Sequence, residues 1–380
     1  MIGWQYHIDT DPELIGFHFL ALSAGYVVAA AIAQRLLHRV PMRNVALASC
    51  VLGIASLLGL ALVAPPAQPA LRIFVLAFVG GSGGLLATSL LYILEPNFAS
   101  APAILANRAG ALFGSGCLIA TAMMGATYFA GSVQIETALL ALAPVIFLFT
   151  FASNKLEAAR KPAEIKHEES QLRDTLRDLR SVAAVLFSLL LFFQMGNEWA
   201  IAGWLPLFLI HRLGANPVWA IFALAAYFAA LLVGRLLAQS WLRRLNHRRL
   251  LLASGFAAVA GYLFLSLTQS MPEAWVAVLL IGFGFAPIYP VVAETLDDRF
   301  SYHPGFYNGL FSMAMMGAML APWALGYVDS FLGMRYVMLL PAFGSVAVLI
   351  LALLIMLESH VMGGKNLDAE KARPAVAGRT

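Results

Sequence analysis

The stretch FFQMGNEWAIAGWLPLFL (Phe192–Leu209) is apolar enough to cross a lipid bilayer, yet it carries a carboxylate, Glu198, near its middle. On insertion scales, a charged side chain at the centre of a membrane helix costs about 2.5–3.5 kcal/mol. Ionisable residues at that depth face the protein interior or a cavity and commonly serve the function of the protein. The stretch therefore predicts a membrane-spanning helix and a candidate site on it.

The rest of the chain has the same apolar character. Of its 380 residues, 61% are hydrophobic and 12% are charged, whereas about 25% of the residues of a soluble domain are charged. Runs of about 20 apolar residues recur along the chain, as in transmembrane helices. These runs are too long for barrel strands and do not alternate with polar residues. The sequence predicts an all-α polytopic membrane protein.

Hydropathy places about eleven spans along the chain. They are expected near 14–34, 44–63, 70–94, 104–130, 134–153, 182–210, 218–238, 250–268, 272–293, 305–328 and 334–357. With this map, all but three of the 24 Lys and Arg residues fall on one side of the membrane. Loops rich in Lys and Arg face the cytoplasm. We therefore expect an integral protein of the plasma membrane (the inner membrane of a bacterium), with the N-terminus outside and the C-terminus in the cytoplasm.

The chain divides into two similar halves. The segment RVPMRNVALAS (Arg39–Ser49) aligns with RLNHRRLLLAS (Arg244–Ser254), and two further pairs of short segments follow in the same order. Repeats of this kind indicate a duplicated helical bundle with a site between the halves. We expect an N-terminal bundle at 1–153, a cytoplasmic connector at 154–181, a C-terminal bundle at 182–357 and a cytoplasmic tail at 358–380.

These features resemble the major facilitator superfamily, and within it the fucose permease-related group of sugar and small-solute symporters. The resemblance rests on Gly196-Asn197-Glu198 with Trp204-Leu205-Pro206, on Gly234-Arg235-Leu236, on Gly282-Phe283-Gly284 through Tyr289-Pro290, and on Gly317 through Pro322 to Gly326. It implies two pseudo-symmetric bundles of helices. The basic loop Arg35–Arg43 matches the loop after the family's second helix, so the first helix has no counterpart here. A start assigned too far downstream, a true eleven-span variant and a decayed gene would each explain this, and the first is favoured.

Glu198 is the candidate proton-coupling residue. Gln194 lies four residues before it, so the two side chains share one helical face. No Lys or Arg lies in the same span to hold the carboxylate ionised. Glu198 is therefore expected to gain and lose a proton near neutral pH, although a structural ion pair would also explain it. The candidate substrate-binding residues are Gln194, Asn197, Trp204, Tyr289 and Asn308.

Gating contacts are expected at the cytoplasmic ends of the spans. The resemblance implies roles for Arg35 and Arg39 in the loop after the first span. Arg235 is expected to pair with Asp297 or Asp298 and to brace one state of the transporter. Interfacial snorkelling of the long Arg235 side chain is the alternative.

The function expected is secondary active transport of a small solute, such as a sugar, by alternating access with proton coupling. A multidrug or metabolite exporter of the same superfamily and a non-transporting membrane sensor or scaffold are the alternatives. The sequence has no nucleotide-binding motif and no cluster of catalytic or metal-ligating residues, so we expect no enzyme activity, cofactor or metal. The basic residues form no stripe, which argues against a nucleic-acid partner. The expected partners are the solute, protons and the lipid bilayer.

Overall fold

A computed structural model describes residues 11–36, 39–63, 68–94, 102–129, 133–153, 181–242, 247–297, 300 and 304–371. These residues form helices and no strand. The helices are α2 (Pro12–Leu36), α3 (Met42–Leu62), α4 (Pro69–Ile93), α6 (Pro102–Phe129), α7 (Val133–Leu140), α8 (Leu142–Ser153), α10 (Val182–Leu213), α11 (Pro217–Leu242), α12 (His247–Leu267), α13 (Met271–Phe285), α14 (Ile288–Asp297), α15 (Pro304–Leu332), the 3-10 turn η3 (Met334–Tyr336) and α16 (Leu339–Lys371). Within the described residues they supply 11 candidate membrane spans. This confirms the all-α fold and the expected number of spans.

Two of the expected spans are interrupted. The span expected at 134–153 consists of α7 and α8, which are separated at Ala141. The span expected at 272–293 consists of α13 and α14, with a turn at Ala286 and Pro287 between them. Proline lacks the backbone N–H that a continuous helix needs, and its ring clashes with the preceding turn. The break between α13 and α14 therefore lies just before Tyr289.

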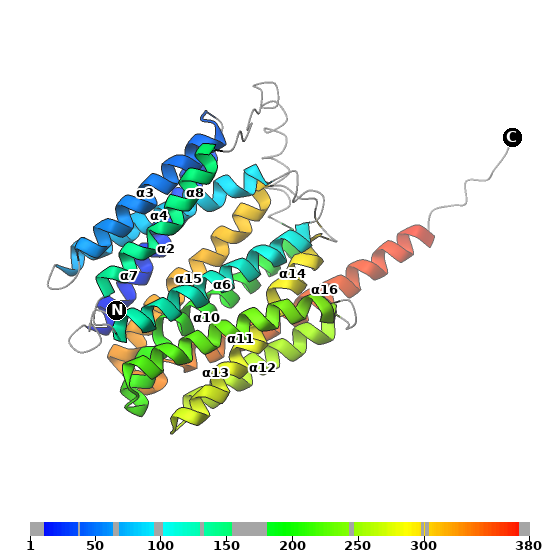
Figure 1. Ribbon diagram of the computed structural model, residues 1–380. Coiled ribbons are helices and arrows are strands. Elements are labelled where there is room, and N and C mark those ends of the chain that lie inside the picture. The colour runs from blue at the N-terminus through cyan, green and yellow to red at the C-terminus, as the bar shows by residue number, and fades with distance from the viewer. Residues whose placement is uncertain are drawn as a thin grey trace.

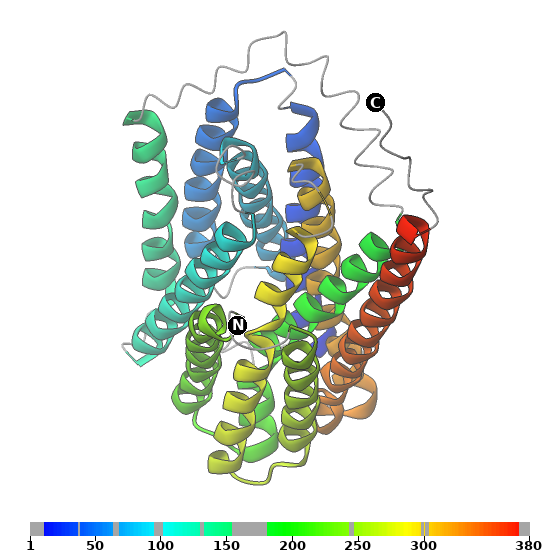
Figure 2. The same cartoon turned by 90° about the vertical axis from the view of Figure 1, so that its right-hand side faces the viewer.

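The helices form two groups. Figure 1 shows α2, α3, α4, α7 and α8 on one side and α10 to α14 with α16 on the other, with α6 and α15 between them. In Figure 2, α8 and α16, which end the two halves, lie at opposite edges. The halves meet where α2 packs along α15 and where α6 packs against α11 and α14. Residues 154–180 of the expected connector at 154–181 and the chain beyond Lys371 lie outside the described residues.

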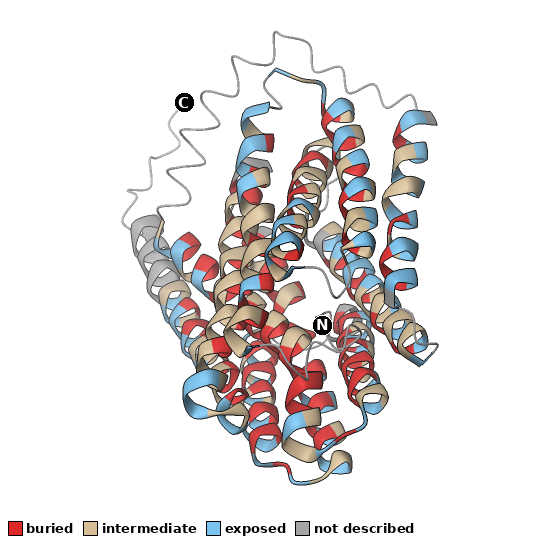
Figure 3. Ribbon diagram, turned by 90° about the vertical axis from the view of Figure 1, so that its left-hand side faces the viewer, coloured by how far each residue is buried: buried red, intermediate tan, exposed pale blue. Residues whose placement is uncertain are grey.

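The two halves are buried to different degrees (Figure 3). In the N-terminal half 22–39% of each span is buried, against 39–72% in the C-terminal half. The C-terminal half contains α10, which packs against α11, α15 and α16 and supplies much of the main hydrophobic core. The described part of the N-terminal half has five spans, and their helices are less buried than those of the C-terminal half.

Small residues let α2 and α4 pack with their backbones in contact. A Cβ atom added to Gly25 would meet the carbonyl oxygen of Ala77, and one added to Gly80 would meet that of Leu22. Gly84 lies in the same way against Tyr26. In lipid there is little hydrophobic force between helices, so close packing of small residues drives their association. The glycine-rich segment of α4 is therefore a helix-packing surface.

Substituting Gly25 with Ala is expected to destabilise the protein by about 1–3 kcal/mol, because overpacking forces the two helices apart. Gly116→Ala is the matched control, since a Cβ atom there would meet no atom within 4 Å. The control should be neutral or slightly stabilising, because Ala favours a helix over Gly by about 1 kcal/mol. Thermal unfolding in detergent measures the difference. Equal unfolding temperatures for the two variants would contradict the packing described.

Candidate functional site

A cavity of about 510 Å³ lies between the two halves. Its walls come from α2, α4 and α6 of the N-terminal half and from α10, α11, α14 and α15 of the C-terminal half. The lining residues are Leu22, Tyr26, Val79, Gly80, Gly83, Ala87, Leu90, Ala109, Gly110, Phe113, Met195, Glu198, Trp199, Arg235, Tyr289, Phe311 and Met315. Most of them are apolar, and this volume suits a small organic molecule.

Glu198 lies in the middle of α10 and reaches this cavity. The helix begins after Ser181, whose side chain accepts a hydrogen bond from the backbone N–H of Ala184. One turn before Glu198, the Nε2 atom of Gln194 donates a 2.9 Å hydrogen bond to Oε1 of Glu198. The shared face expected from their four-residue spacing is therefore confirmed. Gln194 itself is buried and supports Glu198 from outside the cavity lining.

Arg235 of α11 forms an ion pair with Glu198. Its Nη2 atom lies 3.2 Å from both carboxylate oxygens, and the two side chains are 4% and 7% exposed. The span of Glu198 supplies no cation, as expected, and the neighbouring helix supplies the partner of the ion pair that was the alternative interpretation. The expected pairing of Arg235 with Asp297 or Asp298 is not tested by this contact and stays a prediction. The side chain of Asp297 and all of Asp298 lie outside the described residues.

Arg235 also connects the two halves of the protein. Its Nη1 atom donates a 2.9 Å hydrogen bond to the backbone carbonyl of Gly110 on α6. The Tyr289 ring lies beside the guanidinium, with Cζ of Arg235 5.9 Å from the ring centroid. A Cβ atom at Gly110 would come within 3.3 Å of that ring, so glycine permits the approach. One side chain thus contacts α10, α14 and the opposite half.

Several other titratable side chains surround the ion pair. Tyr227 comes from α11, Tyr262 from α12, Cys117 from α6 and Tyr289 from α14, and each interacts electrostatically with Glu198. The hydroxyl of Tyr262 donates a 2.9 Å hydrogen bond to the backbone carbonyl of Asn197. Among these described neighbours, only Arg235 carries a positive charge. Arg235 and Gln194 are the side chains that donate hydrogen bonds to the Glu198 carboxylate.

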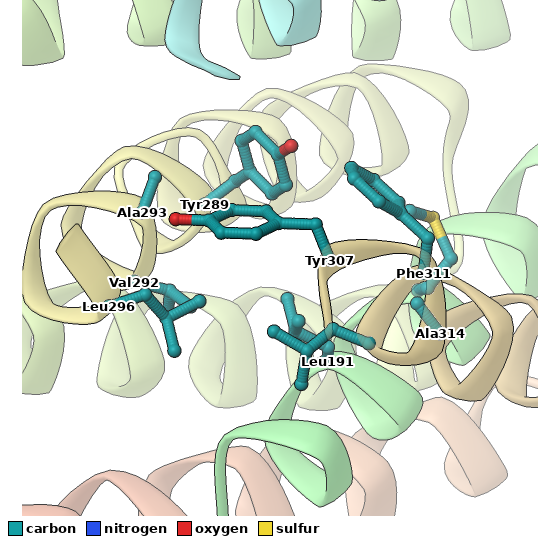
Figure 4. Close-up of a pocket in the computed structure, with 10 residues that line it drawn as sticks. Leu191, Tyr289, Val292, Ala293, Leu296, Tyr307, Phe311 and Ala314 are labelled. Atoms are coloured by element: carbon teal, nitrogen blue, oxygen red, sulfur yellow. The ribbon is translucent and has the colours of Figure 1, made fainter. Parts of the chain in front are cut away.

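Tyr289 separates the cavity from a smaller pocket between α10, α14 and α15. Figure 4 shows this pocket, in which the rings of Tyr289, Tyr307 and Phe311 face the aliphatic side chains of Leu191, Val292 and Leu296. Its volume is about 20 Å³, which is room for about one water molecule. Tyr289 and Phe311 also line the large cavity. The predicted substrate contact at Tyr289 is thus compatible with its position.

Besides Gln194, three other predicted substrate-binding residues do not line the cavity. Asn197 points toward α16, where its Nδ2 atom donates a 3.2 Å hydrogen bond to Ser345. Trp204 is fully buried and donates a 2.9 Å hydrogen bond to the carbonyl of Pro322 on α15. Asn308 accepts a 3.4 Å hydrogen bond from Thr88, which links α15 to α4 of the other half. In this structure these three residues connect neighbouring helices, and their assignment to the substrate stays a prediction.

The remaining predicted gating residues, Arg35 and Arg39, are exposed at and just beyond the end of α2, away from the ion pair.

The sequence did not predict Tyr26, Gly110 and Phe113, which line the cavity from the N-terminal half. The hydroxyl of Tyr26, in the middle of an apolar span, could have indicated a residue that lines the cavity. Gly110 acts through its backbone carbonyl, so its side-chain type gives no such indication.

No group of three or more His, Cys, Asp or Glu residues able to hold a metal occurs within the described ranges.

The two bundles and the cavity between them define an integral membrane protein with the architecture of a secondary transporter. The family model of the Major Facilitator Superfamily matches residues 1–316. The chain therefore belongs to the Major Facilitator Superfamily.

Solved structures of this family have the same fold. The chain is 16% identical to the transporter FucP in its outward conformation, with a TM-score of 0.64 and 93% of each chain covered. A variant of the E. coli fucose:proton symporter FucP is 14% identical, with a TM-score of 0.60, and 93% of this chain and 92% of that chain are covered. A D-xylose-proton symporter is 14% identical, with a TM-score of 0.69 and coverage of 90% and 87%. No curated protein matches the sequence.

Proposed function

We propose that the chain moves a small organic solute across the membrane by alternating access, and that proton uptake and release at Glu198 drive the transport. The cavity between the halves supports this, because a midplane site of this kind opens to either side when two bundles rock against each other. The solved symporters of fucose and xylose are described as proton-coupled. At 14% identity, the likeness to these structures supports the fold alone. The proton coupling of this chain is therefore proposed from the residues of its own site.

The observation that carries the proposal is the double role of Arg235. It pairs with Glu198 in the C-terminal half and with the Gly110 carbonyl in the N-terminal half. A proton on Glu198 removes the negative charge that holds the guanidinium in this position. The contact between the halves is then weakened or re-formed elsewhere. Protonation of one carboxyl group would in this way change the balance between two arrangements of the bundles.

The proposal includes a direction and a location. The distribution of Lys and Arg supports a plasma-membrane protein with a cytoplasmic C-terminus. A proton gradient directed inward would then drive uptake of the solute with the proton. A sugar is one candidate solute, by analogy with the fucose and xylose symporters.

Transport by protein reconstituted in liposomes tests this function. The liposomes receive an inward proton gradient and an external pool of sugars, carboxylates and cationic drugs, and mass spectrometry measures the internal contents. At least one solute should rise above its external concentration and fall back when a protonophore removes the gradient. Equal internal contents in liposomes with and without the protein would contradict the proposal.

A further inference from the structure

The charge balance of the cavity limits which solute can bind there together with a proton. Glu198 is the one carboxylate that pairs with Arg235 among the residues that the structure describes. Arginine stays positively charged at any physiological pH. A proton on Glu198 would therefore leave a buried guanidinium without a counter-charge, and removing one partner of a buried ion pair is strongly unfavourable. Proton uptake becomes favourable when the solute itself supplies a negative charge.

The geometry of Arg235 suits such a replacement. Its Nη1 atom donates a hydrogen bond to the Gly110 carbonyl, whereas Nη2 alone donates to both oxygens of Glu198. The Nε atom is buried and has no hydrogen-bond partner in the described structure. Nε and Nη2 form one edge of the planar guanidinium, which can hold a carboxylate through two parallel hydrogen bonds. The edge that faces Glu198 thus has an unused donor for a second carboxylate.

The remainder of the cavity suits an apolar molecule. Its polar side chains are Tyr26, Glu198, Trp199, Arg235 and Tyr289, and the other lining residues are apolar or glycine. Leu22, Leu90, Phe113, Met195, Phe311 and Met315 provide most of the bulky surface. A sugar would bring many hydroxyl groups, and each one buried without a partner opposes binding. A polyhydroxylated solute therefore fits this wall less well than a molecule with an aliphatic or aromatic body.

We propose that the cavity binds a monocarboxylate with an apolar body, together with one proton on Glu198. The solute carboxylate takes the place of the Glu198 carboxylate at Arg235, and the proton neutralises Glu198. One negative and one positive charge enter together, so the charge of the site is unchanged. This inference rests on the proposed transport function for its biological meaning, and it replaces the neutral sugar expected from the sequence.

Binding measurements on the purified protein test the inference with four probes of known structure. The probes are 3-phenylpropionate, its neutral analogue 3-phenylpropanol, its cationic analogue 3-phenylpropylamine, and D-xylose. Titration calorimetry gives the affinities, and a pH-indicator dye in weakly buffered solution gives the number of protons bound. The carboxylate should bind at least tenfold more tightly than the other three probes and should take up close to one proton per molecule. Equal binding of the alcohol, the amine or the sugar, or binding of the carboxylate without proton uptake, would overturn the inference.

Substitution of Glu198 with Gln separates the proton from the carboxylate. The uncharged amide imitates protonated Glu198, so Glu198→Gln should bind 3-phenylpropionate without proton uptake and with an affinity that does not change with pH. Glu294→Gln is the matched control, because Glu294 pairs with His247 at 3.1 Å outside the cavity, and it should behave as the wild type. Persistent proton uptake in Glu198→Gln would overturn the role of Glu198. Binding of the four probes and proton uptake by the wild-type protein require no variant. Those measurements therefore test the inference even if Glu198→Gln folds poorly.

The two proposals can fail separately. Proton-linked binding of 3-phenylpropionate without any transport in liposomes would remove the transport function and keep the binding site. Proton-driven accumulation of D-xylose, with no binding of the carboxylate, would keep the transport function and remove this inference.

Discussion

Replacing Glu198 with Gln is expected to abolish accumulation of the transported solute against its gradient while leaving exchange of solute across the membrane intact. The amide cannot carry a proton, so the proton gradient no longer does work on the solute. Uptake into liposomes should then stop when the internal and external concentrations are equal. Exchange of internal for external labelled solute should continue at a rate that is insensitive to pH.

The control for this experiment is Glu294→Gln, which removes a carboxylate from the partly exposed pair with His247. It should accumulate solute as the wild type does. If Glu198→Gln still concentrates the solute with an unchanged pH profile, Glu198 is a structural residue and the coupling lies elsewhere.

Removing Glu198 and removing Arg235 from their ion pair are expected to lower the stability of the protein by different amounts. Glu198→Met leaves a buried guanidinium that cannot lose its charge, which should cost about 3–5 kcal/mol. Arg235→Met leaves a carboxylate that can be neutralised by a proton, so it should be less harmful. In that variant the folded protein binds a proton that the unfolded chain does not bind, and its stability should rise as the pH falls.

The double variant, with Met at both positions, removes both charges and should be close to the wild type in stability. Replacing a buried ion pair with apolar side chains of similar volume is often neutral or stabilising. Thermal unfolding of the four proteins in detergent, at several pH values, completes the double-mutant cycle. Additive losses from the two substitutions would contradict the buried pair.

Hydropathy predicted the spans well because the bilayer imposes a minimum length of apolar helix on the sequence. The pairing of Gln194 with Glu198 followed from their separation by about one helical turn. The positions of Asn197 and Trp204 outside the cavity lining could not be predicted, because hydropathy does not give the rotation of a helix about its axis. Adjacent residues point about 100° apart, so Asn197 faces Ser345 on α16 while Glu198 faces the cavity.

The partner of Arg235 could not be predicted for a related reason. Arg235 and Glu198 lie on separate helices, 37 residues apart in the chain, and packing of α10 against α11 brings them together. Its position near the end of the span expected at 218–238 favoured Asp297 and Asp298, but a long side chain can extend along the helix toward the membrane centre. The contact with Gly110 is made by its backbone carbonyl. Because every residue has such a carbonyl, the sequence does not show which one Arg235 contacts.

In the proposed mechanism, Glu198 pairs with Arg235 as a carboxylate until a solute binds, and it becomes protonated when the solute takes its place. Difference infrared spectroscopy observes this step directly, because a protonated carboxyl group has a C=O stretching band that a carboxylate lacks. Addition of 3-phenylpropionate to the wild-type protein should produce that band, and the band should be absent in Glu198→Gln and present in Glu294→Gln. Binding of 3-phenylpropionate to the wild-type protein without such a band would contradict protonation of Glu198.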